Sequence, residues 1–179
     1  GDRSRAAFKL IELNNKFKFI KKNSNILDIG AYPGGWSQVS SKIITSGKIL
    51  SIDLHSMNEI KNVSFLQGDF QKEASKKEIL KFFGENIDVI ISDMAADTTG
   101  NKSLDCIRTN QLCADVINFS TKTLKPNGVL VTKSFMGEDF LEIKRLAKEK
   151  FKIVQFFKPE SSRNESKETY LHCAILKTL

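Results

Sequence analysis

The sequence predicts an α/β fold: a mostly parallel sheet of seven strands, with one antiparallel strand near the C-terminus and helices on both faces. Short apolar runs alternate with helical stretches along the chain, which is typical of a parallel sheet covered on both sides. The last two apolar runs are joined by a polar loop too short for a crossover helix, so these strands should pair antiparallel. Open sheets of this kind bind ligands at the carboxyl ends of their strands, which is where we expect the chemistry.

The first element is an amphipathic helix over residues 4–22, with Ser4 as its N-cap and apolar residues at helical spacing. Strands are expected at 26–30, 48–53, 63–66, 87–93, 129–133, 153–157 and 169–176. Helices between them are expected at 36–45, 72–83, within 103–124 and at 138–151. Pro126, Asn127 and Gly128 predict a turn before the fifth strand.

The composition indicates one globular domain. The 179 residues include 40% apolar and 27% charged side chains, and no repeat or linker divides them. We therefore expect a single domain over residues 1–179, with the helix of residues 1–22 packed on it. No apolar run approaches the roughly 18 residues that a membrane-spanning helix needs. Three cysteines without C-x-x-C spacing indicate free thiols in an intracellular, reducing compartment.

The charge of the chain favours a polyanionic partner. The net charge is +7, and the pI is about 9.3. Residues 1–22 hold seven basic and two acidic side chains, which is most of the excess. This strip is either a solvated helix face or a surface that contacts phosphates, and charge alone does not separate the two interpretations.

A glycine-rich turn follows the first strand, in the run Asp28-Ile-Gly-Ala-Tyr-Pro-Gly-Gly-Trp-Ser37. The spacing matches neither the dinucleotide fingerprint nor a phosphate loop, so it suits a nucleoside ligand without phosphates, such as S-adenosylmethionine. Asp53 ends the second strand, where a carboxylate can accept both ribose hydroxyls. Asp69 follows the third strand and could accept from an adenine amino group. Each feature alone could be structural, but their ordered series favours a cofactor site.

Charged residues also mark the later strand ends. Asp93 ends the fourth strand, Lys133 ends the fifth, and Glu168 precedes the last. The segment at Asp93 lacks the Asn/Asp-Pro-Pro-aromatic element typical of enzymes that methylate exocyclic amines, and no cysteine nucleophile for pyrimidine carbon stands there. If the sheet is wound as argued, Asp93 and Lys133 face the same cleft. Taken singly, each could be a surface charge or a loop cap.

The motifs together resemble the FtsJ/RrmJ (RlmE) family of S-adenosylmethionine-dependent RNA 2′-O-methyltransferases, over essentially the whole chain. The segments that carry the resemblance are 3–10, 30–38, 67–70, 92–95, 99–105, 124–128, Lys133 and 166–170. The resemblance implies a Rossmann-like methyltransferase fold and S-adenosylmethionine as cofactor. Two departures are visible: Tyr32 stands where the family usually has a small residue, and Ala96-Asp97 replaces a usual Pro-Asn.

Site residues carry over from the family position by position. The catalytic tetrad would be Lys9, Asp93, Lys133 and Glu168. Cofactor contacts would fall on Gly30, Pro33, Gly34, Gly35, Trp36, Asp53, Asp69 and Asp93. The candidate RNA-binding residues are Arg3, Arg5, Lys9, Lys158, Arg163 and Lys167. His55 and His172 lack metal-ligand spacing, so we interpret both as structural or surface residues and expect no metal site.

The chemistry expected of the tetrad is methylation of a ribose 2′-hydroxyl. Lys133 would be the base or the group that orients the hydroxyl. Lys9 and the cationic cofactor would lower its pKa, whereas Asp93 and Glu168 would oppose that shift, and the sequence does not decide which influence prevails. Lys9 could instead hold the ribose or a phosphate of the substrate.

The resemblance points to a uridine of large-subunit ribosomal RNA as the target, with rRNA or the ribosomal subunit as partner. We expect a monomer without membrane association, in the cytoplasm, or in the mitochondrion or nucleolus of a eukaryote. A tRNA or mRNA-cap methyltransferase shares the tetrad and stays an alternative. Two others are a noncatalytic RNA-binding ribosome-assembly factor and, more remotely, a nicotinamide-dependent oxidoreductase, which the missing G-x-G-x-x-G disfavours.

Overall fold

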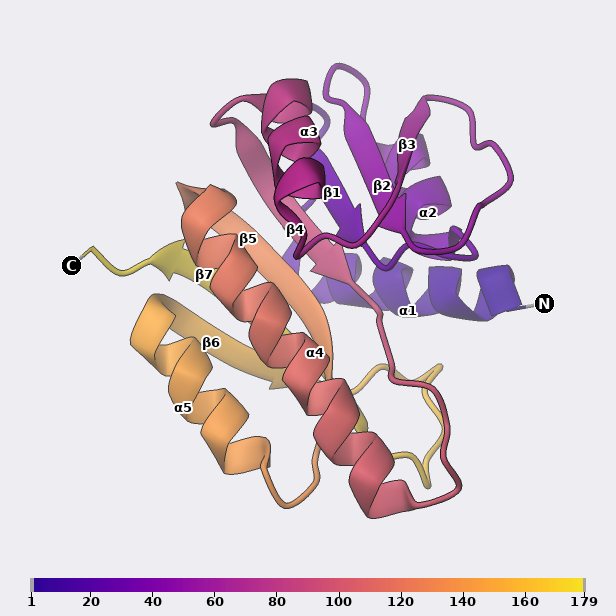
Figure 1. Ribbon diagram of the computed structural model, residues 1–179, viewed down its shortest axis with the longest axis vertical. Helices are drawn as coiled ribbons and strands as arrows, with labels where there is room; N and C mark the ends of the chain where they lie inside the picture. The colour runs from indigo at the N-terminus through magenta and orange to yellow at the C-terminus, as the bar shows by residue number, and fades with distance from the viewer. Residues whose placement is uncertain (1, 179) are drawn as a thin grey trace.

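The computed structural model describes the backbone of residues 2–178 and the side chains of residues 5–178. Its seven strands form one sheet in the order β3-β2-β1-β4-β5-β7-β6 (Figure 1). The strands are β1 Ile26–Ile29, β2 Ile49–Asp53, β3 Val63–Gln67, β4 Ile87–Ser92, β5 Leu124–Phe135, β6 Phe151–Phe157 and β7 Glu168–Leu176. The helices are α1 Asp2–Phe17, α2 Gly35–Ile43, α3 Glu73–Phe83, α4 Lys102–Thr123 and α5 Phe140–Lys150.

The predicted architecture is confirmed. Strands β1 to β5 pair in parallel, and β7 pairs antiparallel with both β5 and β6. Helices α3, α4 and α5 cover the near face in Figure 1, and α1 and α2 lie behind the sheet. Successive side chains of a strand point to opposite faces, so each strand contributes to both apolar layers. In β4, Ile90 packs in the α3–α5 layer, whereas Val89 and Ile91 pack toward α1 and α2.

The first helix differs from its predicted bounds at both ends. It begins at Asp2, so Ser4 lies inside the helix rather than at its N-cap. It ends at Phe17, because Lys18 adopts a left-handed backbone conformation with φ 51°. The side chain of Asn14 then accepts a hydrogen bond from the Ile20 N–H at 3.0 Å, which turns the chain away from the helix axis. Ile20 is buried at the end of this turn rather than on a helical face.

The turn predicted at Pro126–Gly128 is wrong, since these residues lie within β5. Leu124 pairs with Ile87, and the pairing resumes between Val129 and Val89 after a register shift. The extra residues of β5 therefore form a bulge. A side chain on Gly128 would collide with Leu124 and with the Asp88 carbonyl, so glycine serves close packing there and not a chain reversal.

The cysteines are free, with Cys113 and Cys173 buried, and burial raises the pKa of both thiols. None of the helices in the described part of the chain combines the length and apolarity that a bilayer crossing needs. Within residues 5–178, no group of three or more His, Cys, Asp or Glu side chains is arranged to hold a metal ion.

Candidate active site

Strand alternation carries charged side chains to one edge of the sheet. On the face toward α1 and α2, Val131 in β5 is followed two residues later by Lys133. Lys133 pairs directly with Tyr170 of β7, and paired residues of neighbouring strands share a face. Asp93 follows the buried end of β4, which is the neighbour of β5. Asp93 and Lys133 therefore lie near the carboxyl ends of neighbouring strands, as predicted, although β5 continues to Phe135 beyond Lys133.

The four tetrad residues form a continuous chain of alternating charge. Lys9 Nζ of α1 lies 2.8 Å from Glu168 Oε1. Lys133 Nζ lies 3.3 Å from Glu168 Oε2 and 3.3 Å from Asp93 Oδ1. Their side chains are 9% to 20% exposed, and Asp93 is the most exposed of them. Buried charges of this kind are stable only when they are paired, and here each has an opposite neighbour.

Two hydroxyl groups complete the cluster, and sequence reasoning missed both. The Tyr170 hydroxyl donates to Asp93 Oδ1 at 2.6 Å and also lies 3.2 Å from Glu168 Oε1. Ser162 Oγ donates to Glu168 Oε1 at 2.9 Å. The spacing of Glu168 and Tyr170 was the available signal for the tyrosine, because residues two apart in a strand share a face. Ser162 lies in the β6–β7 loop, whose path the sequence pattern does not define.

The cluster fixes the ionisation of its members. Burial alone would lower the pKa of the Lys133 ammonium, but Asp93 and Glu168 outweigh burial and raise that pKa above its ordinary value. Burial would raise the pKa of Glu168, but Lys133, Lys9 and Ser162 together lower it to about 2. Burial and the two carboxylates raise the pKa of Tyr170 well above its ordinary value. Lys133 is therefore an ammonium and Glu168 a carboxylate at neutral pH.

A cavity of about 440 Å³ opens beside Asp93 at the same edge of the sheet, a size within the usual range of small-molecule sites. It is lined by residues at the ends of four elements, among them Gly30, Asp53, Asp69 and Met94. Gly30 has φ 70°, and a side chain there would collide with Met94. Asp53 and Asp69, predicted at the ends of β2 and β3, thus face one space together with Asp93.

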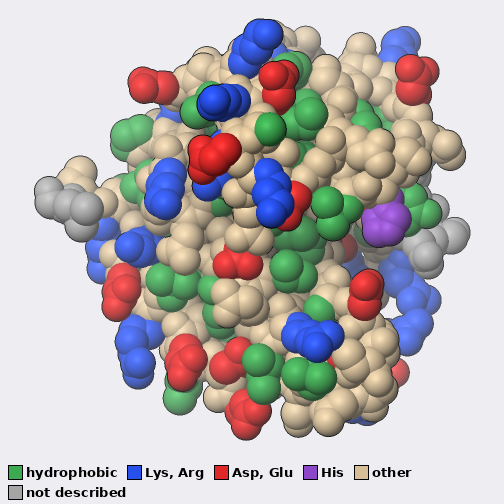
Figure 2. Space-filling model, viewed as in Figure 1, with side chains coloured by type: hydrophobic (Ala, Val, Ile, Leu, Met, Phe, Trp, Pro, Cys, Tyr) green, Lys and Arg blue, Asp and Glu red, His purple; other side chains and the backbone are tan. Residues whose placement is uncertain are grey.

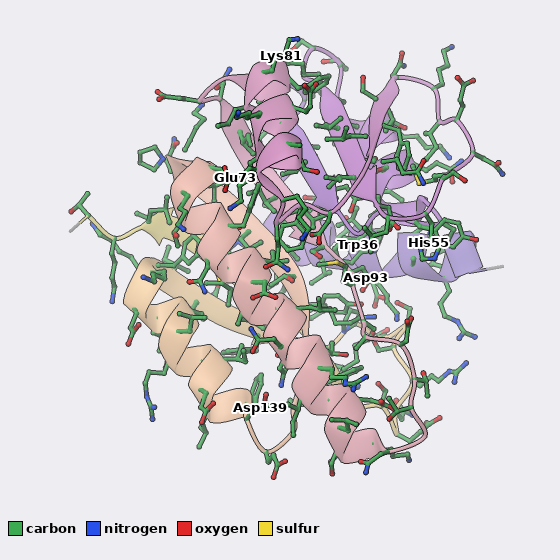
Figure 3. All side chains as sticks on the ribbon, viewed as in Figure 1. Trp36, His55, Glu73, Lys81, Asp93 and Asp139 are labelled. Atoms are coloured by element: carbon green, nitrogen blue, oxygen red, sulfur yellow. The ribbon has the colours of Figure 1, made fainter. Side chains whose placement is uncertain are left out.

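Pro33, Gly34, Gly35 and Trp36 of the glycine-rich turn do not line this cavity. Pro33, Gly35 and Trp36 line a smaller hollow of about 40 Å³ that also includes Asp93. Gly34 caps α2 with φ 113°. The buried Trp36 donates from Nε1 to the Ala6 carbonyl at 2.7 Å, which ties α2 to α1 (Figure 3).

Comparison with known proteins decides the family. The FtsJ-like methyltransferase model matches residues 3–176. The chain belongs to this family. The resemblance drawn from the motifs is confirmed, the chain is a methyltransferase, and S-adenosylmethionine is the methyl donor that membership implies.

Relatives match nearly the whole chain. A protein of Pelagibacter ubique is 46% identical over 177 residues, which cover 99% of this chain and 87% of that protein. One of Rickettsia akari is 46% identical and covers 96% of this chain and 78% of its own length. Both are named ribosomal RNA large subunit methyltransferase E.

Solved structures agree with the fold. A Plasmodium falciparum protein, provisionally described as a ribosomal RNA methyltransferase, has a TM-score of 0.86 at 36% identity, covering 97% of this chain and 98% of that one. Aeropyrum pernix fibrillarin has a TM-score of 0.60 at 13% identity, covering 87% of this chain and 68% of that one, a likeness of fold alone.

The cavity fits the cofactor of this family. The Asp53 carboxylate at its rim accepts backbone hydrogen bonds from Tyr32 and His55, both at 2.9 Å, and these hold it in place. Asp69 Oδ1 accepts from the Gln71 N–H at 3.0 Å. Two carboxylates fixed by backbone donors can accept the hydroxyl and amino groups of an adenosine, and the apolar Met94 and Phe70 line the space with them.

The candidate RNA-binding residues have different surroundings. Arg5, Arg163 and Lys167 are exposed, whereas the side chain of Arg3 lies outside the described residues. Lys158 is partly buried, and its ammonium donates to the Ser166 and Glu168 carbonyls at 2.6 and 3.0 Å. Its charge is therefore engaged inside the β6–β7 loop. On the α3–α5 face, basic and acidic side chains are interspersed (Figure 2), so that face offers no patch of one sign.

Proposed function

We propose that this methyltransferase transfers a methyl group to the 2′-hydroxyl of a ribose in large-subunit ribosomal RNA, on a uridine. The observation that supports this most directly is the buried chain Lys9–Glu168–Lys133–Asp93, whose most exposed member also lines the cavity. Such a cluster suits the positioning of a neutral hydroxyl, a poor nucleophile, beside a reactive methyl group.

Each residue of the cluster has its own role. Bound in the cavity, S-adenosylmethionine supplies a methyl group that its sulfonium makes electrophilic. Asp93 borders both the cavity and Lys133, so it links the two halves of the site. Lys133 stays protonated because Asp93 and Glu168 raise its pKa, and it therefore orients the hydroxyl oxygen as a donor rather than acting as a free base. The hydroxyl proton leaves to water as the oxygen takes the methyl group. Lys9, held by Glu168 from the α1 side, contacts the ribose or its phosphate.

The relatives support the substrate class. The Pelagibacter and Rickettsia proteins are named for the ribosomal RNA of the large subunit, and both come from bacteria. We therefore infer the same RNA as substrate, in the bacterial cytoplasm. We further propose that the protein acts as a monomer. The exposed Arg5, Arg163 and Lys167 provide phosphate contacts beside the cluster.

Radiolabelled methyl transfer tests the proposal. The protein is incubated with labelled S-adenosylmethionine and, separately, with large-subunit rRNA, ribosomal subunits, tRNA and capped RNA, and the modified sugar is mapped. Label at a 2′-oxygen of a uridine in large-subunit rRNA is expected. Label on a base, or only on tRNA or a cap, contradicts the proposal.

A further inference from the structure

The Asp53 carboxylate is already occupied by its neighbours. Oδ2 accepts a hydrogen bond from the Tyr32 backbone N–H at 2.9 Å. Oδ1 accepts from the His55 backbone N–H at 2.9 Å and also faces the His55 ring atom Nδ1 at 3.2 Å. The carboxylate side chain is only 12% exposed, whereas that of His55 is 75% exposed. The imidazole therefore covers a carboxylate that lines the cavity.

Tyr32 favours this position of the imidazole. The two rings lie 5.5 Å apart between centroids at an angle of 36°, and both line the cavity. Tyr32 is itself 56% exposed, and the contact with its ring replaces part of the solvent around the imidazole of His55. Tyr32 is one of the two departures from the family pattern described above, and His55 is the residue interpreted from its spacing as structural or surface.

The imidazole leaves too few acceptor positions on Asp53 for both hydroxyls of a ribose. A carboxylate offers about four lone-pair positions, roughly two on each oxygen. The two backbone N–H groups use one on each oxygen. The imidazole, when its proton is on Nδ1, uses the second position on Oδ1, which leaves one on Oδ2. The 2′- and 3′-hydroxyls of a ribose need two.

We propose that His55 competes with the cofactor ribose for Asp53, so that this imidazole sets the affinity for both the methyl donor and the spent nucleoside. This inference rests on the proposed role of Asp53 in the cofactor site. The ring leaves easily, because it is mostly exposed and Asp53 is its one side-chain hydrogen-bond partner among the described residues. Its return to Oδ1 favours release of the product, a step that often limits turnover.

Calorimetric binding tests the competition, because competition predicts the direction in which the Kd changes when the imidazole is removed. His55→Ala should lower the Kd for S-adenosylmethionine and for S-adenosylhomocysteine about threefold to fivefold, the order expected for loss of one exposed contact to a carboxylate. His55→Asn places an amide N–H2 where Nδ1 stood, so its Kd should stay near that of the wild type. A ring that instead closes over the bound nucleoside would give the opposite sign, and a raised or unchanged Kd in His55→Ala overturns the proposal.

A ligand without the diol provides the matched control. The 2′,3′-dideoxy analogue of S-adenosylhomocysteine should bind the wild type and His55→Ala with equal Kd, and a gain that persists with it contradicts competition for Asp53. Asp53→Ala distinguishes the cofactor role of Asp53 from the competition by His55. If it leaves cofactor binding unchanged, the proposed cofactor role of Asp53 fails; if it weakens binding while His55→Ala brings no gain, the competition alone fails.

Discussion

At the scale of single residues, Lys133 shows how surroundings choose between two chemical roles. A lysine near a cationic cofactor is a candidate base, but the carboxylates of Asp93 and Glu168 at 3.3 Å hold its proton. The same contacts make the position sensitive to substitution, because removing one partner of a buried ion pair leaves the others uncompensated.

We expect Lys133→Arg to fold and to bind S-adenosylhomocysteine, since the charge of the cluster is preserved, but to lose about 10²-fold or more in kcat because the donor is displaced. Methyl transfer to rRNA and calorimetry measure the two properties. Lys133→Ala should lose as much activity and also lower the Tm. Near-normal turnover in either variant would remove Lys133 from the centre of the mechanism.

Asp28 is a second residue whose environment controls its charge. Asp28 is 1% exposed at the start of the glycine-rich turn, where its carboxylate accepts a hydrogen bond from Ser37 Oγ at 2.7 Å. Burial raises the pKa of Asp28 to about 7, the hydrogen bonds from Ser37 offset this in part, and Asp93 and Asp53 add to the rise. The folded protein therefore holds a proton here that the unfolded chain releases near pH 4.

This difference predicts a pH dependence with a definite sign. Between about pH 4 and pH 7 the folded state binds more protons at Asp28 than the unfolded state does, so its contribution to stability is full below this window and decreases as the pH rises through it. Asp28→Asn should remove that part of the decrease. Urea unfolding of both proteins at pH 4, 5, 6 and 7 measures it, and parallel curves would contradict the assignment.

At the scale of elements, Asn110 joins α4 to the end of β5. It is fully buried, and its amide Nδ2 donates to the Phe135 carbonyl and to Asp139 Oδ1. Its Oδ1 accepts from Ser134 Oγ at 2.7 Å and from the Phe135 N–H at 2.8 Å. One side chain thus fixes the strand end that carries Lys133 and the loop that leads into α5.

Asn110→Ala should lower the free energy of unfolding by about 3 kcal/mol, because several buried polar groups lose their partner. It should also reduce kcat, since β5 loses its support next to Lys133. Asn118→Ala is the matched control: Asn118 is exposed on the same helix, and its change should stay within about 0.5 kcal/mol. Equal unfolding curves for the two variants would contradict the argument.

Sequence patterns predicted the elements that repeat a simple period and failed where local contacts override it. The alternation of strands and helices predicted the sheet, and the strand ends predicted the positions of Asp93 and Lys133. The left-handed Lys18 depends on the Asn14 side chain, and the bulge before Val129 depends on packing of Gly128 against Leu124. The Ser162 hydroxyl and the internal Lys158 depend on how the β6–β7 loop folds back, which no periodicity encodes, whereas Tyr170 lies two residues after Glu168 in β7 and could have been predicted from strand alternation.

At the scale of the whole molecule, the excess positive charge contacts RNA phosphates only where the basic side chains are exposed and unpaired. Arg163 and Lys167 are exposed on the β6–β7 loop, which α1 holds through Glu12: this carboxylate accepts from the backbone N–H groups of Glu160 and Ser161 at 2.8 and 3.1 Å. The loop and α1 therefore present one surface next to Lys9.

Removing exposed and internal cations from this surface should have different effects. The double variant Arg163→Ala, Lys167→Ala should reduce the slope of log K against log salt for rRNA binding by about 1.4 to 1.8, the loss of two phosphate contacts. Lys158→Ala should leave the slope unchanged and lower the Tm, because its ammonium bonds carbonyls within the loop. Filter binding from low to high salt measures the slope. A drop in slope for Lys158→Ala alone would mean that Lys158, rather than Arg163 and Lys167, contacts the phosphates.

The pairing of β7 with β5 limits how the coding region can diverge. Glu168 and Tyr170 meet the cluster because they occupy alternate positions of a strand whose partners are Phe135 and Lys133. Deleting one codon between Tyr170 and Cys173 would rotate both side chains to the opposite face while every catalytic group remained encoded. Codons gained or lost among the exposed residues 163–165 leave that alternation intact. The length of the β6–β7 hairpin can therefore change during divergence, whereas the number of residues in β7 cannot.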